Sequence, residues 1–106
     1  MSIIKYNKLV RDRIPEIIEA SRKTCKTTVL DDAEYLRMLD AKLDEELAEY
    51  RKDQNIEELT DLLEVIYAAA VARGYTVEKL ERVREKKAQE RGAFQNRILL
   101  VEVKQN

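Results

Sequence analysis

The sequence predicts a mainly α-helical protein, and three observations support this fold class. Only two glycines and one proline interrupt the 106 residues, so few positions favour a break over a helix. Apolar residues in the middle of the chain recur at the three- and four-residue spacing of amphipathic helices. Residues that commonly cap helices precede these stretches. We therefore expect one domain over residues 1–106, an antiparallel helical bundle with short accessory strands near 26–30 and 97–103.

The first two predicted helices flank one of these strands. Proline suits the first turn of a helix, so Pro15 places the first helix from there to about Lys23. The segment KTTVL at 26–30 is rich in β-branched residues, which favour a strand. An aspartate after it, Asp31 or Asp32, is expected to cap a second helix that continues to the polar segment KDQN.

Two further helices and the second strand complete the chain. Asn55 is the expected cap of a third helix that ends at Gly74, because glycine commonly terminates helices. Thr76 is expected to begin a fourth helix that ends near Gly92. The closing sequence RILLVEV, residues 97–103, is aliphatic and β-branched and is therefore predicted as a strand.

The composition excludes several classes of function. The 20 Lys+Arg and 21 Asp+Glu leave a net charge of −1, without the basic excess of proteins that bind nucleic acids or anionic membranes. Histidine is absent, which excludes Ser-His-Asp and Cys-His catalysis and His-ligated zinc. A lone cysteine excludes an intrachain disulfide, and neither a membrane span nor a secretory signal is recognisable, so we expect a cytoplasmic protein.

Cys25, that single cysteine, is flanked by Lys23 and Lys26 within the sequence KTCKT. Nearby cations favour a lowered pKa for its thiol. Without a histidine or a second cysteine beside it in the sequence, we expect no catalytic role for this side chain.

Four acids form two pairs on the predicted second and third helices. Glu46 and Glu49 are three residues apart beside the apolar stripe of one helix, and Glu58 and Asp61 hold the same position on the next. The short KDQN link should make the helices antiparallel and bring the pairs together. Facing carboxylates repel unless a divalent cation lies between them, and oxygen ligands suit Mg²⁺, Mn²⁺ or Ca²⁺. The alternative is a solvated acidic surface, because about one residue in five is acidic.

Two groups of cations are candidates for binding phosphate. Lys87 and Arg91 are four residues apart on the predicted fourth helix and would together suit a triphosphate, or else are ordinary cations near a helix C-terminus. In the segment NKLVRDRIP, Lys8 and Arg11 could reach the same phosphates. Alternatively, Arg11 or Arg13 pairs with an acid and stabilises the entry to the first helix, which we slightly favour.

These motifs together resemble the MazG-like superfamily of all-α nucleoside triphosphate pyrophosphohydrolases. The segments KLDEELAEY and IEELTDLLEVIYA look like its two metal-binding signatures, Glu-x-x-Glu followed by Glu-x-x-Asp. The opening YNKLVRDRIPEIIE, the segment VLDDAEYL and the closing ERGAF resemble a small branch of predicted house-cleaning pyrophosphatases. The resemblance covers nearly the whole chain, although the break YRKDQNIE is shorter than in many relatives.

The resemblance implies Mg²⁺-dependent hydrolysis of a standard or damaged nucleoside triphosphate to the monophosphate and pyrophosphate, with Mn²⁺ as an alternative cofactor. It also implies a homodimer or larger homo-oligomer. One metal-held carboxylate would orient or deprotonate the attacking water. Carried over by position, the metal-binding and catalytic residues are Glu46, Glu49, Glu58 and Asp61, and the phosphate-binding residues are Lys87 and Arg91.

Two other functions fit the same sequence. The chain could be a non-catalytic helical homodimer that senses a nucleotide or binds a partner, in which case its acids serve only solubility. It could also be a phosphoribosyl-ATP pyrophosphohydrolase, whose enzymes share the carboxylate-bearing helices. Dependence of turnover on Mg²⁺ separates the first alternative from the enzyme, and the choice of substrate separates the second.

Overall fold

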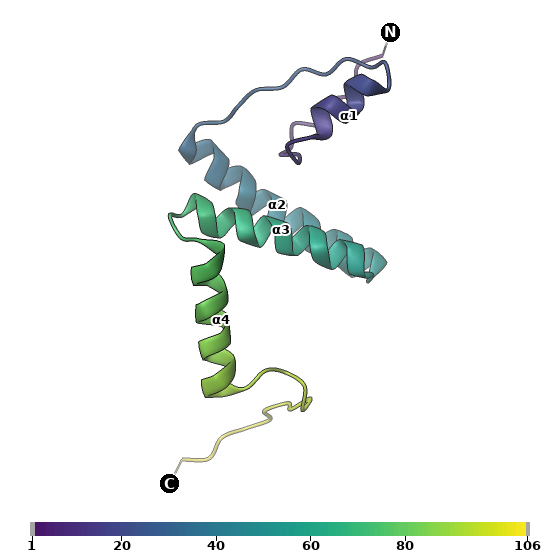
Figure 1. Cartoon of the computed structure of the whole chain (residues 1–106). Coiled ribbons are helices and arrows are strands. Elements are labelled where there is room, and N and C mark those ends of the chain that lie inside the picture. The colour runs from purple at the N-terminus through teal and green to yellow at the C-terminus, as the bar shows by residue number, and fades with distance from the viewer. Residues whose placement is uncertain (1, 106) are drawn as a thin grey trace.

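The computed structural model describes residues 2–105 as four α-helices joined by irregular segments (Figure 1). The helices are α1 (Ile14–Ala20), α2 (Asp32–Asp53), α3 (Ile56–Ala72) and α4 (Val77–Arg91). The predicted all-α class is therefore confirmed. None of these helices, within the part of the chain that the structure describes, combines the length and apolar composition needed to cross a membrane.

Hydrogen bonds confirm three of the predicted helix starts. The side chains of Asp31, Asn55 and Thr76 each accept a hydrogen bond from the backbone N–H three residues later, at 2.8, 3.0 and 3.0 Å. Each bond satisfies one of the N–H groups that a helix leaves unpaired in its first turn. Gly74, just beyond the end of α3, has a φ of +92°, a conformation that glycine adopts without steric cost.

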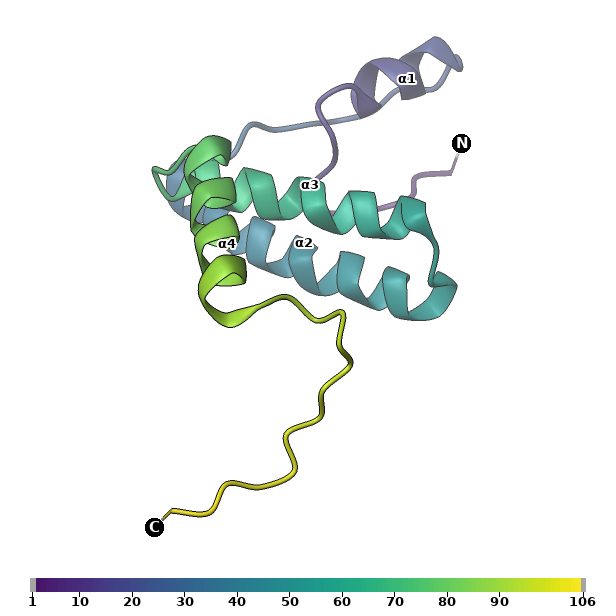
Figure 2. The ribbon, with the colours of Figure 1, turned by 60° about the horizontal axis from the view of Figure 1, so that its bottom comes forward.

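Both predicted strands are wrong. Residues 26–30 and 97–103 are irregular, and no strand occurs anywhere between residues 2 and 105. A strand needs a neighbour to pair its backbone groups, and these two segments lie at opposite ends of the molecule (Figures 1 and 2). Neither segment therefore has a neighbouring strand, in spite of its β-branched residues, and Val29 is 98% exposed.

The centre of the fold is an antiparallel hairpin of α2 and α3, which lie side by side along their length (Figures 1 and 2). Gln54 turns the chain between them in the left-handed conformation, with a φ of +51°. Among residues 2–105, Leu39 and Glu46 are the two that are buried, and both face this seam. The hairpin therefore encloses one apolar and one acidic side chain.

The other two helices add little to this core. α4 contacts the C-terminal end of α3 and departs from the hairpin at a steep angle (Figure 1). α1 packs against no other helix in the described range. The molecule is consequently elongated, with extents of 70 × 31 × 23 Å. The four helices do not close into a bundle within one copy of the chain.

Candidate metal centre

Carboxylates from both helices of the hairpin converge near its turn. Glu46 of α2 and Glu58 and Asp61 of α3 each offer an oxygen, and these atoms all lie within 4.8 Å of one another. Glu46 is buried, whereas the other two are half-buried. The sequence favours this convergence, because a short link commonly joins two helices that pack antiparallel.

A second group of acids adjoins the first and shares Glu58 with it. Oxygens of Glu49, Asp53 and Glu58 also lie within 4.8 Å of one another. The four predicted acids therefore gather in two overlapping groups rather than in one. Sequence reasoning missed Asp53, although its spacing of four residues from Glu49 places both on the same side of α2.

The first group fits a small divalent cation. Magnesium holds oxygen ligands at about 2.0–2.1 Å in an octahedron, so its ligands are about 3 Å apart when adjacent and about 4.2 Å apart when opposite. The oxygens of Glu46, Glu58 and Asp61 lie within a comparable distance of one another. Carboxylate oxygens are also the ligand type that Mg²⁺ and Mn²⁺ prefer.

The electrostatics of Glu58 reflect this crowding. Desolvation raises the pKa of its carboxyl, and the negative charges of Asp53, Asp61, Glu49 and Glu46 raise the pKa further. A carboxylate among four others is costly to ionise without a compensating cation. A cation bound at this point would remove that cost.

Lys42 lies beside the buried acid on the α2 side. Its Nζ is 3.4 Å from Glu46 Oε1 and 3.2 Å from Glu45 Oε1. Desolvation acts to raise the pKa of Glu45, but hydrogen bonds from Lys42 and Lys8 outweigh it, and the pKa is lowered. Lys42 was also missed, although it precedes Glu46 by one helical turn.

The N-terminal segment brings two cations onto the same acidic side of the hairpin. Arg11 Nη2 lies 2.7 Å from Asp61 Oδ1, and Arg11 Nη1 lies 3.7 Å from Glu64 Oε1. Lys8 Nζ lies 3.3 Å from Glu45 Oε1. Pairing of Arg11 with an acid, which the sequence favoured, is therefore confirmed. Asp61, a member of the candidate metal centre, already has a cation beside it.

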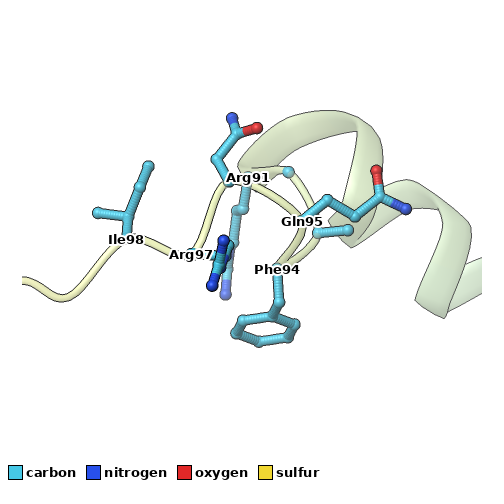
Figure 3. A pocket seen from close by; sticks show the side chains of 8 residues that line it. Arg91, Phe94, Gln95, Arg97 and Ile98 are labelled. Carbon is cyan, nitrogen blue, oxygen red and sulfur yellow. The ribbon is translucent and has the colours of Figure 1, made fainter.

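Lys87 and Arg91 are not brought to these acids within one chain. α4 begins beyond Ala72, about 16 Å along α3 from Asp61 at 1.5 Å per residue, and then leads away from the hairpin (Figure 1). Arg91 instead lines an open hollow of about 290 Å³ at the end of α4, together with Phe94 and Arg97 (Figure 3). No acid lines this hollow.

Cys25 lies against α1, and the expected direction of its pKa is wrong. Desolvation raises the pKa of the thiol, and so do the charge of Glu19 and a hydrogen bond to it. Cys25 Sγ is 3.7 Å from Glu19 Oε1. Desolvation and the neighbouring carboxylate of Glu19 thus outweigh the sequence-adjacent lysines.

Comparison with known proteins adds little to this geometry. No family model matches the chain, and no solved structure gives a significant match. An uncharacterized protein of Mycolicibacterium smegmatis is 63% identical over 43 residues, which are 41% of this chain and 44% of that protein. The match thus spans less than half the length of its relative, and that relative carries no described activity.

Proposed function

We propose that the chain is a nucleoside triphosphate pyrophosphohydrolase that uses Mg²⁺, with Mn²⁺ as a substitute. It would hydrolyse standard or damaged nucleoside triphosphates to the monophosphate and pyrophosphate, as the resemblance to the MazG-like superfamily implies. The observation that carries the proposal is the convergence of Glu46, Glu58 and Asp61 from two helices within 4.8 Å. Their carboxylates repel one another at a partly buried seam, and a divalent cation would offset that repulsion.

The chain's own residues then have distinct roles. Glu46, Glu58 and Asp61 would hold the metal. Bound Mg²⁺ would neutralise charge on phosphate oxygens and acidify water. Glu49 or Asp53, in the adjoining group, would orient the attacking water and accept its proton. The burial of Glu46 excludes bulk water from one side of this arrangement.

The cations near the site would bind the phosphates. Arg11 Nη2 lies 2.7 Å from Asp61 Oδ1. A small rotation of the Arg11 side chain would turn its guanidinium toward a phosphate beside the metal. Lys8, which contacts Glu45, would act similarly. Lys87 and Arg91 lie on α4, which leads away from the acids, and would reach phosphates only from a second copy. The proposal therefore includes a homodimer or larger homo-oligomer, as the resemblance implies.

The test is release of pyrophosphate from a panel of standard and damaged nucleoside triphosphates and phosphoribosyl-ATP, with Mg²⁺ or with EDTA. Asp61→Asn removes one proposed ligand, and Glu57→Gln removes an exposed carboxylate from the same helix as a matched control. We expect Mg²⁺-dependent release that Asp61→Asn abolishes and Glu57→Gln preserves. Release of pyrophosphate from phosphoribosyl-ATP alone would identify the chain as a phosphoribosyl-ATP pyrophosphohydrolase.

One observation favours a second candidate, a non-catalytic helical homodimer that senses a nucleotide or binds a partner. Large apolar side chains, Leu47, Leu59 and Leu63 among them, are exposed on the hairpin, as in a protein built chiefly to associate. Such a protein would release no pyrophosphate from any substrate. It would also lose nothing when Glu58 or Asp61 is neutralised.

A further inference from the structure

The loop after α4 gathers two positive charges and an aromatic ring in one hollow. The hollow has a volume of about 290 Å³, and Arg91, Phe94 and Arg97 are among the residues that line it (Figure 3). Its other polar side chains, Gln95 and Asn96, are neutral amides. The hollow therefore holds two positive charges and no negative one.

A turn in the backbone brings Arg97 back to the end of α4. Gly92 follows the last residue of the helix with a φ of +84°. The backbone N–H of Arg97 then donates a hydrogen bond to the carbonyl oxygen of Phe94 at 3.4 Å, which closes the turn. Arg97 itself has a φ of +60°, which is uncommon for a residue other than glycine. Residues in such sparsely populated conformations are concentrated at binding and active sites.

Neither arginine of the hollow has an acidic partner. Within residues 2–105, no ion pair includes Arg91 or Arg97, whereas Arg11 contacts Asp61. Glu90, the acid beside Arg91 in the sequence, lies 3.9 Å from Lys86 instead. Like charges that share one hollow repel each other, and an anion between them would offset that repulsion.

The end of α4 opposes an anion less strongly than the arginines favour one. A helix C-terminus carries a partial charge equivalent to about −0.5, and this favours Arg91 but not a negative ligand. The two guanidinium groups together carry a full charge of about +2, so the field in the hollow favours an anion. Guanidinium presents a planar fork of N–H donors that matches two oxygens of a phosphate. Phosphate is therefore the anion that the hollow fits best.

Phe94 supplies an apolar surface beside these charges. It is 97% exposed, so its ring is open to solvent. Figure 3 shows the ring on the side of the loop toward which the Arg91 and Arg97 side chains extend. An aromatic side chain stacks on another flat ring, and stacking on a nucleobase depends little on which base it is. The three side chains together match a ligand that has both a phosphate and a flat ring.

Size and charge favour a small ligand over a nucleic-acid strand. The volume of about 290 Å³ lies at the lower end of the range of about 300–1,000 Å³ for small-molecule sites. The whole chain has a net charge of −1, without the broad basic surface that tracks a phosphate backbone.

From these observations we infer that the hollow binds a small phosphorylated ligand with a flat ring, the chemical class of a nucleotide, with its phosphate between Arg91 and Arg97 and its ring on Phe94. The inference shares Arg91 with the proposed function but assigns Phe94 and Arg97 for the first time. No acid lines the hollow, so binding here rests on neither the proposed metal nor the proposed activity.

The test is isothermal titration of the full chain in EDTA with three probes. AMP has a ring and a phosphate, adenosine lacks the phosphate, and ribose 5-phosphate lacks the ring. Arg97→Gln removes one charge from the hollow, and Phe94→Ala removes its ring. Arg82→Gln is the matched control, because Arg82 is exposed on α4 about 180° from Arg91 and lies outside the hollow. Circular dichroism verifies that each variant stays helical.

We expect the wild type and Arg82→Gln to bind AMP more tightly than either fragment. Phe94→Ala should raise the Kd of AMP by about 5-fold or more, the lower end of stacking contributions, and leave the Kd of ribose 5-phosphate unchanged. Arg97→Gln should raise the Kd of AMP by about 1.5- to 5-fold, as for an exposed ion pair, and leave the Kd of adenosine unchanged.

Three results would overturn the inference: a Kd of AMP above about 1 mM, a Kd that neither Phe94→Ala nor Arg97→Gln changes, or tighter binding of an RNA oligonucleotide than of AMP. The outcome is separate from that of the proposed function. A chain that releases pyrophosphate with Mg²⁺ but binds no AMP in EDTA keeps the activity and loses this site. A chain that binds AMP through the hollow but releases no pyrophosphate keeps the site and loses the activity.

Discussion

Replacing Arg11 with glutamine is expected to tighten the binding of Mn²⁺ or Mg²⁺ to the proposed metal centre. The Arg11 guanidinium lies 2.7 Å from Asp61 Oδ1, so its positive charge competes with a metal that takes Asp61 as a ligand. The two side chains are 55% and 40% exposed, and an ion pair at such a site contributes about 0.2–1 kcal/mol. Removing it should lower the Kd of the metal by about 1.5- to 5-fold.

Isothermal titration of Mn²⁺ into wild type and variant, at one ionic strength and without nucleotide, measures this change. Arg13→Gln is the control, because it removes the same charge from a residue that pairs with Glu16 at 2.9 Å instead of with the metal centre. Arg11→Gln binding no more tightly than Arg13→Gln would refute the reasoning. If the wild type binds no Mn²⁺, the proposed metal centre itself is refuted.

Three further predictions concern stability, each measured by urea denaturation. Leu39→Ala should cost about 2–5 kcal/mol, because Leu39 is 2% exposed and its loss leaves a cavity at the hairpin seam; a loss below about 1 kcal/mol would contradict its place in the core. Asn55→Ala should cost about 0.5–2 kcal/mol by removing the α3 cap, and Asn55→Ser should retain most of it, whereas an equal loss in both would show that the cap bond contributes nothing. For Glu58, the folded-state pKa is raised above 4.5, so the folded chain binds more protons than the unfolded chain, and this residue's contribution to stability falls as the pH rises through that range. Glu58→Gln should therefore stabilise the metal-free protein more at pH about 7 than at about 4, and an equal effect at both would contradict the raised pKa.

Local interactions explain what could be predicted about the helices. Asp31, Asn55 and Thr76 cap their helices with side chains that reach only three residues along the chain, so the cap and its partner are both visible in the sequence. Gly74 similarly marks the end of α3 in the sequence, because glycine commonly terminates helices. The two strands failed because pairing depends on a partner strand that local composition does not reveal.

The candidate site was likewise predicted only in part from the sequence. Helical phase and a short link are enough to place Glu46, Glu58 and Asp61 at one seam. Phase places Asp53 beside Glu49 and Lys42 beside Glu46, although neither was predicted as part of the site. It does not show that Glu58 of the other helix joins both groups of acids, or that Glu58 is the carboxyl whose pKa is raised. These depend on which side chains are close after packing.

By itself, then, the sequence determined the helices, their caps and the two acid pairs, because capping and helical phase act within a few residues. Only the tertiary structure decided that Arg11 lies on Asp61, across 50 residues of chain, and that α4 carries Lys87 and Arg91 away from the acids. It also decided that one apolar side of α3 remains uncovered. Contacts of this kind depend on the angles at which helices meet, and those angles are set by packing over the whole hairpin rather than by any local pattern.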